Sequence, residues 1–104
     1  MTFEIQREGE RAVVSPRGDL VASAVPLLRP AMRDLVRGGV RELVVDLSGT
    51  SMIDSTGLGL LLSAFNSLRA AGGSLAVTNA SEEILNLLQS LRIHQHFPVA
   101  GKRG

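Results

Sequence analysis

The feature that most constrains the fold is a short apolar run, Glu42–Leu47, which reads Glu-Leu-Val-Val-Asp-Leu. A β-branched run with so few polar breaks is typical of a central strand that is buried on both faces. A loop over residues 48–54 follows, and from Ser55 to Ala71 apolar side chains recur with the period of a helix. The apolar positions of this helical pattern are Leu58, Leu61, Leu62, Phe65 and Leu68. A strand that leads through a loop into a helix indicates an α/β domain with a parallel sheet.

The rest of the chain repeats this alternation of strand and helix patterns. Pro30 lies inside the first helical pattern and predicts a late start or a kink, because proline cannot donate the helical hydrogen bond. Asn79, with Glu82 three residues later, resembles a capping box that opens a third helix. The remaining elements are predicted as strands at residues 3–7, 11–17, 74–78 and 97–99, a turn at 8–10 and a first helix at 23–37.

These elements predict one α/β domain over residues 1–104, with its core at about 3–99 and a frayed tail at 100–104. The sheet is expected to be mostly parallel, with an antiparallel hairpin at its N-terminal edge. Helices are expected to cover one face of this sheet, or both.

Composition narrows the class of protein. The chain has 104 residues, 44% of them apolar and 20% charged, which suits one soluble globular domain. It contains no cysteine, which excludes disulfides, thiolate zinc ligands and a cysteine nucleophile. The longest nearly apolar run, Leu58–Phe65, is too short to cross a bilayer, and no signal peptide is visible at the N-terminus. We therefore expect a cytoplasmic protein without membrane insertion.

Basic residues give a weak signal for a partner. Arg29, Arg33 and Arg37 recur every four residues, which is typical of a solvated helix face and also compatible with an acidic partner or anionic lipid. The net charge is +1 and the only aromatic residues are three phenylalanines, none of them interleaved with these arginines. This pattern does not favour a nucleic-acid-binding protein.

Residue patterns that would indicate an enzyme are incomplete. His94 and His96 lack a third metal ligand nearby in the sequence, so no metal or cofactor is expected. Asp46 ends a central strand, but an aspartyl-phosphate receiver also needs an acidic pair after the first strand and a helper lysine, and the only lysine is Lys102. A catalytic triad built on Ser55 has no nucleophile-elbow pattern around it. We expect a binding protein, not an enzyme.

The start of the second helical pattern is open to two interpretations. Asp54, Ser55 and Thr56 are residue types that cap helices by accepting hydrogen bonds from the amides of the first turn. The same place favours anionic oxygen, so a phosphate on Ser55 would be tolerated while adding charge beside Asp54.

The outward face of this helix is the second reason to look for a partner. Helical geometry predicts that Leu60, Ser63, Ala64 and Ser67 point away from the buried stripe, flanked by Gly59. Such a small, uncharged surface suits close docking of another protein. The alternative is that a neighbouring helix or the N-terminal segment covers part of it.

These residues carry a family resemblance. The sequence Asp-Ser-Thr-Gly-Leu-Gly at 54–59, preceded by Val-Val-Asp-Leu-Ser and Met-Ile, resembles the STAS domain of bacterial anti-sigma factor antagonists over about residues 3–99. The resemblance implies a sheet flanked by helices on one side. It also implies partner switching: the unphosphorylated protein binds an anti-sigma factor that is also an ATP-binding serine kinase with a histidine-kinase-like fold. Phosphorylation dissolves that complex, and a PP2C-type phosphatase restores it.

Carried over by position, the resemblance makes Ser55 the phosphoacceptor. Two departures concern partner choice: Val21 stands where a second acidic residue is common after Gly18-Asp19, and the chain stops where a final helix usually begins. STAS-like domains also serve as accessory subunits of lipid or anion transporters, which is the alternative function. The expected partner-binding residues are Asp54, Thr56, Gly57, Leu58, Gly59, Leu60, Ser63, Ser67 and Asp19.

Overall fold

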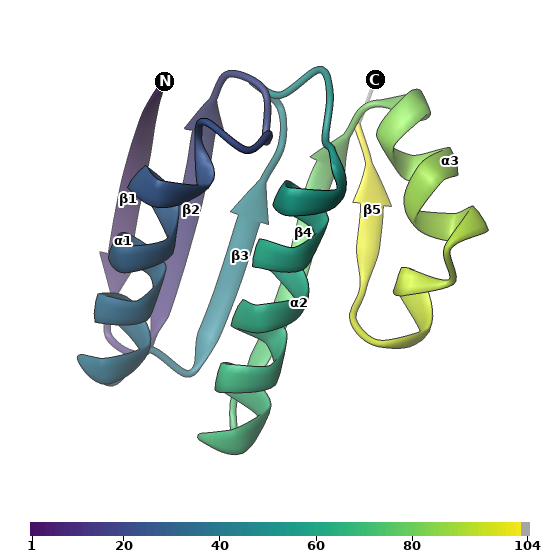
Figure 1. The fold of residues 1–104 in the computed structure, drawn as a ribbon. Helices are drawn as coiled ribbons and strands as arrows, with labels where there is room; N and C mark the ends of the chain where they lie inside the picture. Colours follow the sequence, from purple (N-terminus) through teal and green to yellow (C-terminus); the bar gives the residue numbers. More distant parts are fainter. Residues whose placement is uncertain (103–104) are drawn as a thin grey trace.

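The computed structural model describes residues 1–102 and has the predicted alternation of strands and helices (Figure 1). Its elements in chain order are β1 (Thr2–Glu8), β2 (Arg11–Arg17), α1 (Val25–Arg37), β3 (Glu42–Asp46), α2 (Ser55–Ala70), β4 (Ser74–Ala80), α3 (Glu82–Ser90), the 3-10 turn η1 (Ile93–Gln95) and β5 (Val99–Gly101).

The strands form one five-stranded sheet in the order β1-β2-β3-β4-β5. β1 pairs antiparallel with β2, and the other three pairings are parallel. The prediction of a mostly parallel sheet with an antiparallel N-terminal edge hairpin is confirmed. Because parallel strands point the same way, the loops that follow β2 and β3 emerge at the same edge of the sheet.

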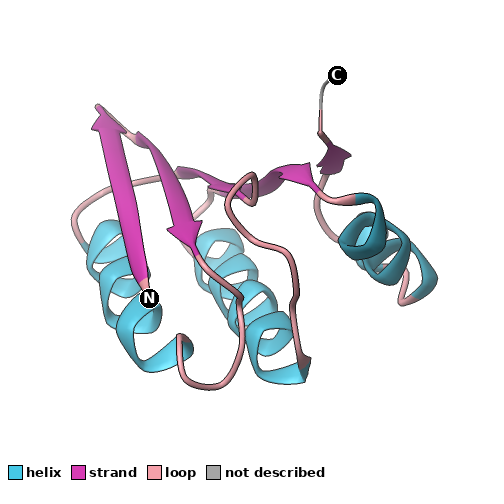
Figure 2. Cartoon of the chain, turned by 90° about the horizontal axis from the view of Figure 1, so that it is seen from above, coloured by secondary structure: helices cyan, strands magenta, loops and turns pink. Residues whose placement is uncertain are grey.

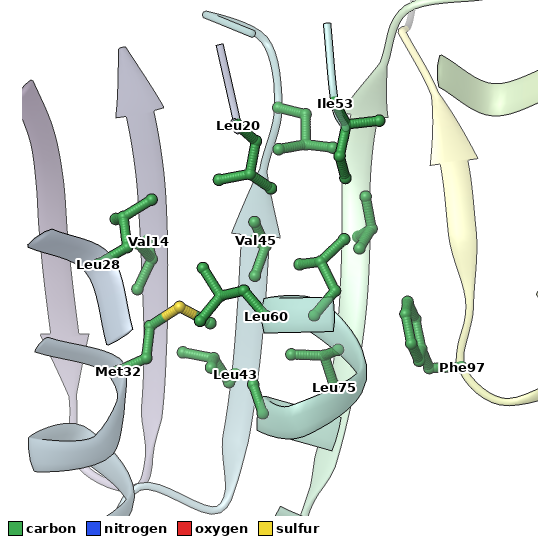
Figure 3. Packing of buried hydrophobic residues seen from close by; sticks show 14 of the residues in the cluster. Val14, Leu20, Leu28, Met32, Leu43, Val45, Ile53, Leu60, Leu75 and Phe97 are labelled. Carbon is green, nitrogen blue, oxygen red and sulfur yellow. The ribbon is translucent and has the colours of Figure 1, made fainter. Parts of the chain in front are cut away.

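All three helices lie on one side of the sheet, which decides between the two layer arrangements left open by the sequence (Figure 2). The core lies between this helix layer and the sheet, where Leu43 and Val45 of β3 are buried (Figure 3). Val44 points to the opposite face and is nevertheless buried. Its register partners on the flanking strands, Val13 and Ala76, shield it. β3 is thus buried on both faces as predicted, although no second helix layer covers it among residues 1–102.

Two local predictions are corrected. α1 begins at Val25 and runs through Pro30, so the helix does not start late. The cap of α3 is Ser81, whose hydroxyl accepts from the Ile84 amide, and not Asn79. Asn79 instead lies within β4, next to its last residue, in a left-handed conformation with φ of 56° that asparagine tolerates better than most residues.

The predicted frayed tail begins too early. β5 extends to Gly101, and the Lys102 amide donates to the Ala80 carbonyl at 3.1 Å. Residues 103–104 of that prediction lie outside the described residues.

Candidate functional site

Two loops meet at the edge of the sheet where β2 and β3 end, and we call them the loop pair: residues 18–24 and residues 47–54. Backbone hydrogen bonds join them, from the Gly18 amide to the Gly49 carbonyl at 3.0 Å and from the Leu20 amide to the Met52 carbonyl at 2.9 Å. Leu20 and Ile53 also form a parallel bridge, and both side chains are buried (Figure 3). The loop that precedes α2 is therefore held by backbone contacts on its neighbour.

Side chains complete the connection. The Thr50 hydroxyl donates to the Gly18 carbonyl at 3.0 Å, and Thr50 is only 2% exposed. The exposed Asp19 accepts through Oδ1 from the amides of Ser51 and Met52, at 3.3 and 3.1 Å. Asp19 is predicted to contact a partner, and in the structure its carboxylate has this internal role. Sequence reasoning missed Thr50, because a single threonine in a polar loop carries no pattern.

Asp54 is the N-cap of α2 and also contacts the other loop. Its Oδ1 accepts from the Gly57 amide at 2.9 Å and its Oδ2 from the Ala22 amide at 3.1 Å. The bond from Gly57 is the main reason that the pKa of Asp54 lies below its usual value; partial burial opposes the shift, and the bond from Ala22 adds to it. Asp54 therefore carries a full negative charge at neutral pH, and its predicted capping role is confirmed.

Ser55 and Thr56 follow directly in the first turn of α2, and both are exposed. Next to them in the loop pair, Met52 is 54% exposed, which is unusual for a large apolar side chain. Sequence reasoning missed Met52, and the signal that could have found it is an apolar residue among the polar residues that precede the cap. The start of α2 thus presents two hydroxyls, one carboxylate and one apolar side chain on a rigid support.

The two glycines of α2 have different environments. Gly57 is buried, and a Cβ atom added there would strike the carbonyl oxygen of Leu20 and lie 2.9 Å from its carbonyl carbon. Gly59 is exposed, and a Cβ atom added there would meet nothing within 4 Å. Gly57 therefore allows α2 to pack on the loop pair. Gly59 leaves the outer surface of the helix without a side chain at that position.

The prediction that one strip of α2 points outward is wrong. This strip consists of Leu60, Ser63, Ala64 and Ser67. Leu60 and Ala64 are buried, and together with Ser63 and Ser67 they border a narrow cleft against Met32 of α1. Figure 3 shows Leu60 reaching from α2 toward Met32. The alternative that a neighbouring helix covers this strip is the correct one, because α1 and α2 pack side by side. Ser63 is half-buried and Ser67 is exposed at the rim of the cleft.

The exposed face of α2 instead follows from Ser55, and we call it the α2 ridge: Ser55, Gly59, Leu62, Asn66 and Ala70. These positions differ by three or four residues and so share one face of a helix. All are exposed except Leu62, which is half-buried, as is Leu58 beside the ridge. None of the five is charged. Of the residues named in the predicted outward strip, only Gly59 lies on this ridge, and Ser55 stands at its N-terminal end.

Asp46 has a structural environment at the end of β3. Its Oδ1 accepts from the Asn79 side chain and from the Ser48 amide, each at 3.0 Å. Burial alone would raise the pKa of Asp46, but the hydrogen bonds from Asn79 and Ser48 outweigh it and lower the pKa. The carboxylate therefore links β3 to β4 beneath the loop pair.

The arginines and histidines considered in the sequence analysis lie in other parts of the fold. Arg29 is half-buried and donates to the Ser63 hydroxyl at 3.3 Å, and Arg33 borders the cleft between α1 and α2, so the arginine series is partly used within the fold. His94 and His96 lie in or beside η1 and are exposed. Within residues 1–102, no three histidine or acidic side chains gather as a metal site, and no helix there has the length and apolarity to span a membrane.

Known proteins are similar to this chain in sequence and in fold. The family model of the STAS domain matches residues 2–103. The chain is 29% identical over 102 residues to the anti-sigma-B factor antagonist of Bacillus subtilis, which covers 98% of this chain and 93% of the relative.

Solved structures have the same fold. An anti-sigma factor antagonist from Mycobacterium paratuberculosis superposes with a TM-score of 0.84 at 23% identity, covering 95% of this chain and 84% of that one. The Bacillus cell fate determinant SpoIIAA in its phosphorylated form superposes with a TM-score of 0.77 at 23% identity, covering 97% and 93% of the two chains.

Proposed function

Since the chain belongs to the STAS-domain family, we propose that it is an anti-sigma factor antagonist, a binding protein whose docking is switched off by phosphorylation of Ser55. In its unphosphorylated form it binds an anti-sigma factor that is also an ATP-binding serine kinase, and so frees the sigma factor. A PP2C-type phosphatase returns it to the binding form. These reactions take place in the cytoplasm.

One observation carries the proposal: Ser55 is exposed at the first position of α2, directly beside a fully ionised Asp54. A phosphate on Ser55 adds about −1.5 to −2 charges at neutral pH. Because Asp54 keeps its own charge, the site becomes strongly anionic. The N-terminal end of α2 tolerates this anion, so the fold survives while acidic or closely packed groups of a partner are repelled.

The docking surface in this proposal is the start of α2 together with the α2 ridge. Asp54, Thr56 and Leu58 lie close to Ser55 along the chain, Asp19 contacts the loop that precedes α2, and Gly59 leaves room for the partner's backbone. Ser63 and Ser67 lie at the margin of this surface. The buried Gly57 and Leu60 act indirectly, by holding α2 against the loop pair and α1.

The site of phosphorylation is tested with the purified kinase from the source organism and ATP, followed by peptide mass spectrometry. We expect one phosphate, on Ser55, with Ser55→Ala unlabelled. Thr56→Ala is the matched control, since it removes the neighbouring exposed hydroxyl and leaves Ser55 in place. Phosphate on another residue, or none, would refute the proposal.

The effect on docking is tested by calorimetric titration of the same partner. We expect Ser55→Ala to bind like the unmodified protein even in the presence of ATP, and Ser55→Asp to bind more weakly. Ser67→Asp, which adds the same charge at the margin of the docking surface, is expected to have the smaller effect. Equal binding by Ser55→Asp and the unmodified protein would count against a switch at this position.

A further inference from the structure

The outer edge of β1 is the longest unpaired strand edge in the described residues, and we propose that it pairs antiparallel with β1 of a second copy of this chain. β1 has seven residues and stands at one end of the sheet, with β2 on its inner side only (Figure 1). No strand of residues 1–102 lies on its outer side. An unpaired edge presents a row of backbone donors and acceptors that can pair with another strand.

Two of the three charged side chains of β1, which would normally discourage such pairing, are held within their own chain. Glu4 accepts from Arg17 of β2 at 2.6 Å. The Arg7 guanidinium donates to the carbonyls of Gly38 and Gly9, at 2.7 and 3.0 Å. Both side chains are thus directed toward their own domain, and the middle of the edge is left to an apolar residue, Ile5.

Apolar surface accompanies this edge. Ile5 is 38% exposed and opposes Val14 of β2, so it lies on the helix side of the sheet. Leu27 of α1 is 51% exposed. It lies on the same face as Gly38, about three turns further on, and Arg7 of β1 contacts Gly38. Two-fold pairing of β1 would cover Ile5 and bring the α1 helices of the two copies toward each other.

Avoidance of like charges, together with the extent of strand overlap, selects one register. When two β1 strands pair antiparallel, opposed residues must lie on the same face of the sheet. The two-fold axis that relates the copies therefore passes midway between one β1 residue and the same residue of the other copy. We name each register by that residue. An axis at Glu4 opposes Glu4 to its own copy, and an axis at Gln6 opposes Glu4 to Glu8, and both place like charges directly opposite each other. An axis at Ile5 opposes Ile5 to its own copy and Glu4 to Gln6. This register has no like charges directly opposed and pairs all of β1, whereas an axis at Phe3, which also avoids like charges, pairs only residues 2–4 of the strand.

The dimer leaves the proposed docking surface free. α2 lies in front of β3 and β4 and away from the β1 edge, so the two Ser55 sites remain open (Figure 1). The pairing does not depend on phosphorylation or on any partner protein.

The first test uses the absence of cysteine from the sequence. A single cysteine in Ile5→Cys would stand opposite its own copy, at a Cα separation of about 4.5–5.5 Å, which suits a disulfide. Thr2→Cys is the matched control on the same strand, because its two copies would be about 20 Å apart in this register. We expect rapid disulfide-linked dimers from Ile5→Cys under mild oxidation, and far slower linkage from Thr2→Cys.

The second test measures dimerisation by sedimentation equilibrium up to millimolar concentration. Gln6→Lys places a lysine opposite Glu4 twice in each dimer and is expected to tighten the dimer by about 2- to 30-fold, whereas Gln6→Glu weakens it by a similar factor. Position 6 is exposed, so both variants keep the fold. A protein that stays at 11.0 kDa throughout, or equal cross-linking at positions 2 and 5, would overturn the proposal.

Discussion

The opposite environments of Gly57 and Gly59 predict opposite effects of the same substitution in one helix. Replacing glycine by alanine inside a helix normally raises the free energy of unfolding by about 0.5–1 kcal/mol, because alanine loses less conformational entropy on folding. Gly59→Ala should show this gain, since its Cβ atom meets nothing within 4 Å. For a domain of this size the gain corresponds to a rise in Tm of about 2–8 °C.

Gly57→Ala should reverse the sign. The new Cβ atom would strike the Leu20 carbonyl oxygen and lie 3.0 Å from Cγ1 of Ile53. A backbone carbonyl cannot move aside by changing rotamer, so α2 has to shift away from the loop pair. Overpacking of this kind costs about 1–3 kcal/mol and outweighs the helix-propensity gain.

Thermal unfolding followed by circular dichroism measures both variants against the unmodified protein. We expect Tm to fall for Gly57→Ala, by about 5–15 °C, and to rise for Gly59→Ala. Changes of the same sign in the two variants would refute the close contact between α2 and the loop pair.

Three further predictions concern the same end of the molecule. Thr50→Val removes the bond to the Gly18 carbonyl and should lower the free energy of unfolding by about 1 kcal/mol in urea titrations; an unchanged midpoint would contradict this bond. The pKa of Asp54 is lowered in the folded state, mainly by the Gly57 amide. The stabilisation of the fold by the ionised Asp54 is therefore complete above pH 3.8, and it is lost as the pH falls through the folded pKa of Asp54. Asp54→Asn should therefore flatten the dependence of urea stability on pH below 4, and an unaltered slope would argue against it. Ser81→Ala should cost about 1 kcal/mol as the loss of a helix cap, and no change would show that α3 is capped otherwise.

Much of the fold follows from local sequence patterns. The β-branched run Glu42–Leu47 and the helical period after Ser55 each correspond to an element of the predicted type, because both patterns are long and unmixed. The first helix ends at Arg37, as predicted, and Gly39 just beyond it adopts a positive φ of 101°.

The site was less predictable where it depends on tertiary contacts. Leu60 and Ala64 were assigned to the outer face because one helix viewed alone has a single buried stripe. α2 buries two adjoining faces, one against the sheet and one against α1, and a sequence period does not reveal the second neighbour. Asn79 had the spacing of a capping box, but its bond to Asp46 and its left-handed backbone keep it in β4, so Ser81 caps α3 instead.

The most direct measurement compares the unmodified protein with a form carrying phosphoserine incorporated at position 55, using the purified anti-sigma factor of the source organism. Calorimetry gives the affinity, and circular dichroism of the free protein reports whether the domain stays folded. We expect an unchanged spectrum, and a loss of affinity of at least about tenfold. Equal affinity of the two forms, or unfolding of the phosphorylated one, would contradict a charge switch at the start of α2.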